Sequence, residues 1–428
     1  MITDTLHVVH PRAAGIDVHK HQLTATVRVA SGAGEPECET REFSALGPGL
    51  DALAAWLTSH GIEAAAMEGT GVYWRAPLDR LHEDGIEVQL LHAHQVKQLR
   101  GRKTDIEDSR WLARVCQFGL GRPSMVPDRE FHGLRMLSRH RQRLVQERSR
   151  VRNRIQKVID GAGVRVGGIL SDVFGKNGRI ILEGLVEGDD PRDILRRLTR
   201  HVSAKIEHLG DALSMELQDW ERVILADLMD AERLVNARIG ALDKEILKRL
   251  EPYEPILEIL QTMPGIDRTA AAAILAETGP DMTVFPSAQA FAAWAGLAPG
   301  NNMSAGKRRA SATRRGSRFL RSLLVEAAHG ASRTKNCQFA TFRSTLTARR
   351  GYKRAIVATA HKIARALYVM VRDQVPYRDP GTDYEALLVD RNAPRWLRQL
   401  AQFGLLQEQG NGTFRVNWQA RSTATNPA

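Results

Sequence analysis

The first 122 residues alternate short apolar runs of strand length with longer amphipathic runs of helix length. In order, AAGIDVH and QLTATVRVA read as adjacent strands, LDALAAWLTSH as a helix, EAAAMEG as a strand, YWRAPLDRLHEDG as a helix and IEVQLLH as a strand. A further helix is expected around DIEDSRWLARVCQFG. Because strands alternating with helices pack as a sheet covered by helices, this order predicts an α/β domain over residues 1–122.

Residues 123–252 change to a helical pattern. Two apolar stripes run through it: Leu137, Leu144, Val151 and Val158 at seven-residue spacing, then Trp220, Ile224, Leu228, Ala231, Val235, Leu242 and Ile246. Such stripes are typical of helix–helix seams. We therefore expect a coiled-coil or long helical-hairpin linker, interrupted near the glycines of GVRVGGIL and FGKNGR.

A third domain is predicted over residues 253–380, and it begins with LQTMPGIDRTAAAAILAETG. This stretch resembles a helix-hairpin-helix element, whose tight turn aims backbone N–H groups at a phosphate. A plain helix-turn-helix packing unit fits the same letters. Residues 381–428 indicate a small helical appendage and a tail. The predicted fold class is thus multidomain, α/β followed by mainly α.

The positive charge is concentrated in one region. Residues 303–378 hold 18 Lys or Arg against two acids, a balance of +16, whereas the whole chain carries +12. A solvated surface that aids solubility is one interpretation. The basic residues, however, recur among apolar helical positions, which favours a folded surface that binds nucleic-acid phosphates with salt-dependent affinity.

Other features of the sequence bear on where the protein works. Its three cysteines show no C-x-x-C spacing, so we expect buried, reduced thiols rather than a zinc site or disulfides. The N-terminus lacks the apolar core of a signal peptide, and no apolar run of 18 residues occurs. These features predict a protein of the reducing cytoplasm with no membrane segment.

Four acids fall where apolar elements meet polar turns: Asp17, Glu68, Asp105 and Asp108. An isolated D-x-x-D such as Asp105 and Asp108 is usually part of a solvated helix face. Asp17 and Glu68, however, end predicted strands, and the pair at 105 and 108 shares one face of a later helix. RNase H-like nucleases assemble a carboxylate cluster in this order, and such clusters hold Mg²⁺ against a phosphodiester.

Residues beside these acids have two interpretations. His19 either supports the metal ligands or has a structural role. The GTG sequence after Glu68 either allows close backbone approach or forms an ordinary turn. Arg102 and Lys103 are candidates to hold the nucleic-acid backbone.

Ser304 lies in a Gly- and Asn-rich loop directly before Lys307, Arg308 and Arg309. A serine hydroxyl becomes a nucleophile only where its alkoxide is favoured, and these cations could hold a scissile phosphate. A turn serine that satisfies its own loop is the alternative. Ser311 and Ser317 are rival candidates on spacing.

The ordered set GIDVHK, EGTGVYW, GRKTDIEDSRWLA, MPGIDRTAAAAILAE and WAGLAPGNNMSAGKRR closely resembles the DEDD transposases of the insertion-sequence family numbered one hundred and ten. The resemblance covers roughly residues 13–385. It implies a RuvC-like domain, a coiled-coil linker and a transposase domain with a nucleophilic serine. By motif position, Asp17, Glu68, Asp105 and Asp108 are then the acidic tetrad, and Ser304 is the serine. It also implies guidance by a structured bridge RNA and a homo-oligomer, from dimer to tetramer.

The leading hypothesis is a transposase that recombines donor and target DNA with Mg²⁺ and a phosphoserine intermediate. A RuvC-like nuclease that uses only the acids is the first alternative, and a non-catalytic nucleic-acid scaffold is the second. The residues predicted to contact nucleic acid are Arg102, Lys103, Lys307, Arg308, Arg309, Arg314 and Arg315.

Overall fold

The structure is a computed structural model. It describes residues 7–31, 35–69, 71–91, 104–121, 123–300, 303–304, 307–308, 312–409 and 413–416. The chain divides into two compact units, Met1–His132 and Gly133–Ala428. Each unit is described below by itself.

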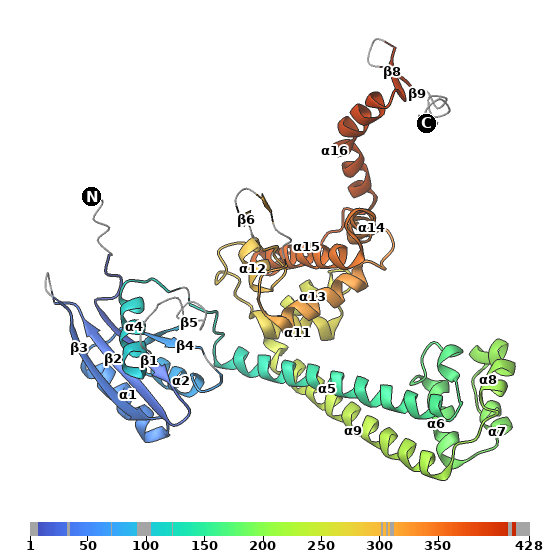
Figure 1. Cartoon of the computed structure of the whole chain (residues 1–428), viewed down its shortest axis with the longest axis horizontal. Coiled ribbons are helices and arrows are strands. Elements are labelled where there is room, and N and C mark those ends of the chain that lie inside the picture. The colour runs from blue at the N-terminus through green and yellow to red at the C-terminus, as the bar shows by residue number, and fades with distance from the viewer. Residues whose placement is uncertain are drawn as a thin grey trace. The chain divides into compact units, whose positions relative to one another are not determined.

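The N-terminal unit is built on a five-stranded mixed sheet (Figure 1). Its strands are β1 (Arg12–Val18), β2 (Gln22–Val29), β3 (Glu37–Ser44), β4 (Ala64–Glu68) and β5 (Glu87–Leu91). They lie in the order β3-β2-β1-β4-β5. The first three pair antiparallel, whereas β4 joins β1, and β5 joins β4, in parallel. This mixed sheet confirms the RNase H-like α/β domain that the sequence predicted.

Helices cover both faces of this sheet. The helices α1 (Gly47–Ser59) and α2 (Arg75–Glu83) pack on one face, where Ile16, Leu53 and Met67 share a core. The helix α4 (Asp105–Gln117) packs on the other face, where Ala13, Ala66 and Leu112 form a second core. Because side chains alternate along a strand, odd-numbered residues of β1 and even-numbered residues of β4 face α4.

Two expectations about this unit were wrong. The strand β3 was not predicted, because its sequence ECETREFS is polar and lies mostly exposed at the sheet edge. A polar edge strand lacks the apolar alternation that marks a half-buried one. Cys38 on β3 is exposed, whereas Cys116 and Cys337 are buried as expected.

Two long helices, α5 (Arg129–Gly161) and α9 (Asp219–Arg249), occupy the predicted linker. Leu144 of α5 and Val235 and Ile239 of α9 form a shared apolar cluster. Buried Glu232 of α9 pairs with Arg152 of α5 at 2.7 Å and with Arg179 at 3.0 Å. A buried carboxylate paired with two guanidinium groups fixes the register of the helices it joins.

In the sequence, a small helical cluster separates the two long helices. It contains α6 (Lys176–Glu187), α7 (Pro191–Arg196), α8 (Ile206–Ala212) and the 3₁₀ turns Val166–Gly168 and Arg200–Lys205. Ile181 and Leu209 belong to an apolar core that also includes Ile155 of α5 and Leu225 of α9. The stripe predicted on α9 was wrong at its start, because Trp220 and Ile224 are exposed while Leu225 is buried in this core.

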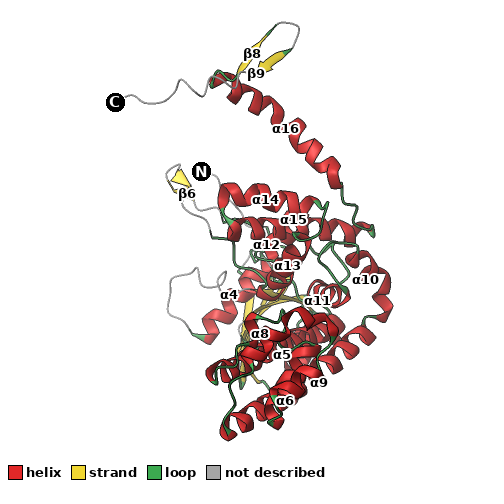
Figure 2. Cartoon of the chain, turned by 90° about the vertical axis from the view of Figure 1, so that its right-hand side faces the viewer, coloured by secondary structure: helices red, strands yellow, loops and turns green. Residues whose placement is uncertain are grey.

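The C-terminal helices gather into one bundle (Figures 1 and 2). They are α10 (Glu254–Gln261), α11 (Arg268–Thr278), α12 (Ala288–Trp294), α13 (Arg318–Ala331), α14 (Gln338–Arg350) and α15 (Tyr352–Asp373), and a 3₁₀ turn, Glu251–Tyr253, precedes α10. Phe291, Leu324 and Leu367 lie in its buried interior. This bundle confirms the predicted helical C-terminal domain.

The turn between α10 and α11 is the segment that resembles a helix-hairpin-helix element. Its Gly265 has a φ of +83°, and a Cβ there would overlap backbone atoms of Ala327 and Ala331 on α13. Close packing against a third helix is what the packing-unit interpretation expects. Phosphate contact at this turn stays a prediction.

Three shorter features complete the unit. A two-stranded ribbon joins β6 (Met303–Ser304) to β7 (Lys307–Arg308). The appendage consists of α16 (Gly381–Gln402) and a hairpin of β8 (Leu406–Glu408) and β9 (Phe414–Val416), drawn beyond α14 in Figure 1. Within the described ranges, no helix is both long and apolar enough to cross a membrane.

Candidate active site

Asp17 stands near the end of β1, on the strand face that α4 covers. The same face carries Gly15, where a Cβ would overlap the backbone of Ala113 and Ser109 in α4. The helix can therefore approach this strand so closely only because residue 15 has no side chain. The carboxylate of Asp17 is 13% exposed, so it opens at the rim of the helix–sheet contact.

The first turn of α4 brings two further acids to this rim. Thr104 caps the helix, since its side chain accepts a hydrogen bond from the backbone N–H of Glu107 at 3.2 Å. Asp105 and Asp108 follow in the first turn, where negative charge interacts favourably with the helix dipole. The sequence GRKTDIEDSR thus supplies both the helix start and two candidate ligands.

A buried polar contact sets the position of α4 over the sheet. The hydroxyl oxygens of Ser109 and Thr26 on β2 lie 2.8 Å apart, and both residues are fully buried. Sequence reasoning missed this pair. Its only signal was that Ser109 directly follows Asp108 on a helix face otherwise made of apolar residues.

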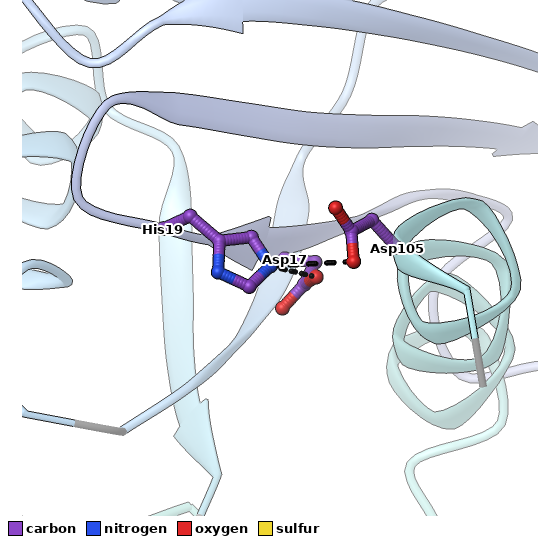
Figure 3. Close-up of side chains that lie close together, drawn as sticks. All are labelled: Asp17, His19 and Asp105. Atoms are coloured by element: carbon purple, nitrogen blue, oxygen red, sulfur yellow. Dashed lines mark hydrogen bonds and ion pairs between the residues drawn. The ribbon is translucent and has the colours of Figure 1, made fainter.

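His19 joins two of the acids (Figure 3). Its Nε2 atom lies 3.1 Å from an oxygen of Asp17 and 3.3 Å from an oxygen of Asp105. Within the described part of the chain, these three side chains form a group whose ligand atoms all lie within 4.8 Å of one another. These contacts place His19 beside two of the candidate ligands, and its role there stays a prediction.

The charges in this group shift its pKa values. Burial raises the pKa of Asp17, the contact with His19 lowers it, and the nearby Asp105 and Asp108 raise it again, with a net increase. Burial lowers the pKa of His19, but the carboxylates of Asp17 and Asp105 raise it further, so the net direction is upward. The charges of Asp105 and Asp108 thus make Asp17 costlier to ionise, and a bound cation would relieve that cost.

Glu68 is the last residue of β4, next to β1 in the sheet. The parallel register pairs Ile16 with Met67, so the following residues, Asp17 near the end of β1 and Glu68 at the end of β4, are neighbours in the sheet. Both belong to the strand face that α4 covers. Asp17, His19 and Asp105 make up the compact group, while Glu68 and Asp108 lie outside it on the same edge.

Ser304 lies in the ribbon of the other unit. It pairs with Lys307 across two residues, and Met303 pairs with Arg308. Backbone hydrogen bonds close the base of this ribbon, from Gly300 N to Ala312 O at 3.0 Å and from Arg314 N to Ala298 O at 2.9 Å. The serine therefore stands near the tip of a ribbon anchored on the helical bundle.

The remaining predicted residues differ in how far the structure describes them. Arg102, Lys103, Arg309 and Ser311 lie outside the described residues, and Lys307 and Arg308 are described by their backbone alone. Arg314 and Arg315 are exposed. The rival Ser317 caps α13, since its Oγ accepts a hydrogen bond from Leu320 N at 3.2 Å and lies 3.5 Å from a carboxylate oxygen of Glu277.

Carboxylate and imidazole groups at one sheet edge suit a divalent cation. Asp17 and Asp105 offer hard oxygen ligands, and His19 offers a nitrogen from the same small volume. An RNase H-like sheet that gathers acids in this way defines a class of enzymes that cut nucleic acids with bound metal ions.

Comparison with known proteins agrees with this class. Residues 14–163 match a DEDD transposase model of the IS110 family, and residues 257–343 match the model described as transposase IS116/IS110/IS902 family. A Pseudomonas aeruginosa protein described as a probable family 20 transposase is 28% identical over 327 residues, or 74% of this chain and 86% of that protein. The transposase for insertion sequence element IS1111A of Coxiella burnetii is 24% identical over 299 residues, or 69% and 74% of the two chains.

The chain belongs to the IS110 family of transposases. Both halves of the family pattern are present in the expected order, so the resemblance noted from the motifs is confirmed. The DEDD domain implies an enzyme that uses a divalent metal ion, and transposase activity implies that it binds DNA.

Proposed function

We propose that this transposase is a site-specific DNA recombinase of an insertion sequence, in which Asp17, Glu68, Asp105 and Asp108 hold Mg²⁺ and Ser304 is the nucleophile. The grouping of Asp17, His19 and Asp105 within 4.8 Å carries the metal part of the proposal. The place of Ser304 near the tip of a ribbon that also carries Lys307 and Arg308 supports the nucleophile part.

The reaction needs no external energy source. A bound Mg²⁺ supplies charge stabilisation for the phosphoryl oxygens. The Oγ atom of Ser304 forms an ester bond to phosphorus, its proton passes to solvent, and the bond from phosphorus to one deoxyribose oxygen breaks with protonation of that oxygen. The hydroxyl of a second DNA end then attacks the same phosphorus and releases Ser304.

Cations of both units are proposed to hold the nucleic acid. In the N-terminal unit these are Arg102 and Lys103, and in the C-terminal unit they are Lys307, Arg308, Arg309, Arg314 and Arg315. Donor and target DNA are the proposed substrates. A structured bridge RNA as guide, and a dimer to tetramer as the active assembly, rest on the family resemblance.

The domain plan is proposed with the boundaries 1–122, 123–252, 253–380 and 381–428. A coiled-coil geometry for α5 and α9 and phosphate binding at the turn before α11 are parts of the same proposal. The first is supported by the apolar cluster of Leu144, Val235 and Ile239. The second has less support, because the carboxyl-bearing residues Asp267 and Glu326 line the cavity beside that turn.

One alternative remains chemically distinct. A RuvC-like nuclease would use the same acids to activate water, and Ser304 would then be a structural residue. The hydrogen bond that Ser317 accepts at the start of α13 favours a structural role for this rival serine, which supports Ser304 as the nucleophile. A non-catalytic scaffold would bind DNA without cleaving it.

Trapping the covalent intermediate tests the proposal. Purified protein, end-labelled DNA carrying the element junction, the RNA transcribed from its flanks and Mg²⁺ would be mixed, denatured and separated by mass. We expect the label to be attached to the wild type and to a folded Ser317→Ala variant. No label should be attached to Ser304→Ala or to Asp105→Asn.

Each other outcome has a clear meaning. Free cut ends from Ser304→Ala would establish the water-activating nuclease instead. Binding without cleavage by the wild type, in Mg²⁺ and in Mn²⁺, would favour the scaffold.

A further inference from the structure

A cavity of about 310 Å³ lies in the basic part of the C-terminal bundle, and none of the proposed catalytic residues lines it. Its lining residues are His329, Ser332, Arg333, Arg343 and Tyr352. They come from the last turn of α13 and the residues after it, from the middle of α14, and from the first residue of α15. The cavity is thus a meeting point of three helices within one unit.

An aromatic pair forms one wall of this cavity. The hydroxyl oxygen of Tyr352 and Nδ1 of His329 are joined by a hydrogen bond of 2.9 Å, and their rings lie 5.9 Å apart at 35°. Nevertheless, 48% of Tyr352 is exposed. A tyrosine that is held in place but keeps half its surface open offers a fixed platform for another planar group.

Two arginine side chains, those of Arg333 and Arg343, also line the cavity. Arg343 lies 5.9 Å from the centre of the Tyr352 ring, and its Nε is buried without a hydrogen-bond partner in the described structure. Among the described residues, no carboxylate pairs with Arg333 or Arg343 within 4.0 Å. Arginines left without an acid beside a cavity favour an anion within it.

The start of α15 adds to the positive field. Gly351 precedes the helix with a φ of +81°, no side chain caps its N-terminus, and the first turn holds no acid. Lys353 and Arg354 follow and are exposed. The N–H groups without a side-chain cap and the helix dipole therefore favour an anion, as the arginines do.

We infer that this cavity binds one nucleotide of a single-stranded nucleic acid, with the base against Tyr352 and the phosphate on Arg333 and Arg343. Its volume is at the lower end for ligand pockets, which suits a single nucleotide. A duplex keeps its bases stacked on one another, so only an unpaired nucleotide offers a free face to the tyrosine. The inference rests on the proposed nucleic-acid function, but the site needs neither the acidic tetrad nor Ser304.

Binding of labelled oligonucleotides to the full chain tests the inference. Fluorescence anisotropy would be measured with single-stranded DNA, single-stranded RNA and duplex DNA of equal length, at several salt concentrations. We expect Tyr352→Ala to weaken single-strand binding by roughly tenfold and duplex binding by much less, because stacking on one aromatic group is lost. Tyr352→Phe keeps the ring and is expected to bind single strands nearly as the wild type does.

Arg343→Ala should weaken single-strand binding and lower its salt dependence by about one phosphate contact. Trp220→Ala and Arg238→Ala are matched controls, because each removes an exposed aromatic or basic side chain from α9, far along the chain from the cavity. Both controls are expected to bind as the wild type does. The DNA and RNA arms show which single strand the cavity prefers.

Equal losses on single strands and duplex in Tyr352→Ala, or no loss in either, would overturn the inference. A Tyr352→Phe variant as weak as Tyr352→Ala would also overturn it, because the hydroxyl and not the ring would then matter. Failure of the proposed function is distinguishable: a protein that never cleaves DNA but shows the Tyr352 effect keeps the nucleotide site and loses only the recombinase.

Discussion

The acidic edge of the sheet and the serine ribbon differ in how the fold holds their functional side chains. Asp17 and Asp105 stand on a buried strand and on a helix that is packed directly against it. Ser304 stands on a strand of two residues, and backbone hydrogen bonds at the ribbon base are its described anchors. The acidic edge is thus fixed by the core of its own unit, whereas Ser304 is anchored through the backbone of a short ribbon.

This difference matches the chemistry proposed for each site. Metal ligands must hold their spacing to within fractions of an ångström, because the cation requires several oxygens at once. A nucleophile that must stay bonded to one DNA end until a second end attacks the same phosphorus benefits from a position away from a packed core. The two sites should therefore respond differently to substitution.

The largest effect is expected for Asp17→Asn. Loss of a ligand charge should lower DNA cleavage by roughly 10³-fold, as for other groups that stabilise transition-state charge. The variant should be at least as stable as the wild type, since neighbouring carboxylates and burial make the charge of Asp17 costly. Cleavage rates and urea unfolding measure the two quantities. Asp51→Asn, at an exposed ion pair with Arg80, is the control and should cleave normally.

Gly15→Ala should break the packing that holds the acidic edge. The new Cβ would overlap backbone atoms of α4, so we expect a loss of about 3 kcal/mol in unfolding free energy and a marked loss of cleavage. Gly47→Ala, where nothing lies within 4 Å of a new Cβ, is the matched control. Similar unfolding curves for both variants would show that α4 does not depend on this close approach.

Gly316→Ala makes the corresponding change at the ribbon base. Its Cβ would meet backbone atoms of Gly296 and Trp294, which should cost about 2 kcal/mol. Because the ribbon would move while the sheet edge stays intact, serine attachment to DNA should fall although metal binding to the protein is unchanged. Isothermal titration with Mn²⁺ and the trapping assay separate these results. Weakened metal binding would contradict the separation of the two sites.

The smallest effect is expected for Ser109→Ala. The variant loses the hydrogen bond to Thr26 between buried hydroxyls, worth about 1 kcal/mol, and cleavage should fall a few-fold because α4 is less firmly placed. Ser109→Thr keeps a hydroxyl but adds a methyl group to a fully buried site. A double change with Thr26→Val should cost less than the sum of the two single changes.

Much of the fold could be predicted from local patterns. The buried strands β1, β2, β4 and β5 carry apolar runs, and α4 starts at a threonine cap followed by acids, so both types of element are visible in the letters. The edge strand β3 is polar and was missed. The core that α6 and α8 share with α5 and α9 was also missed, because many of its apolar residues come from short segments without a long repeat.

The sequence by itself determined the family, the two long helices, the basic C-terminal half and the order of the acids, because each depends on residues near one another or on a motif read in order. Only the tertiary structure decided that His19 contacts both Asp17 and Asp105, that Ser109 fastens α4 to Thr26, and that Tyr352 meets Arg343 at a cavity. Those contacts join residues from different elements. Their distances follow from the packing of whole helices and strands, which no local stretch of sequence contains.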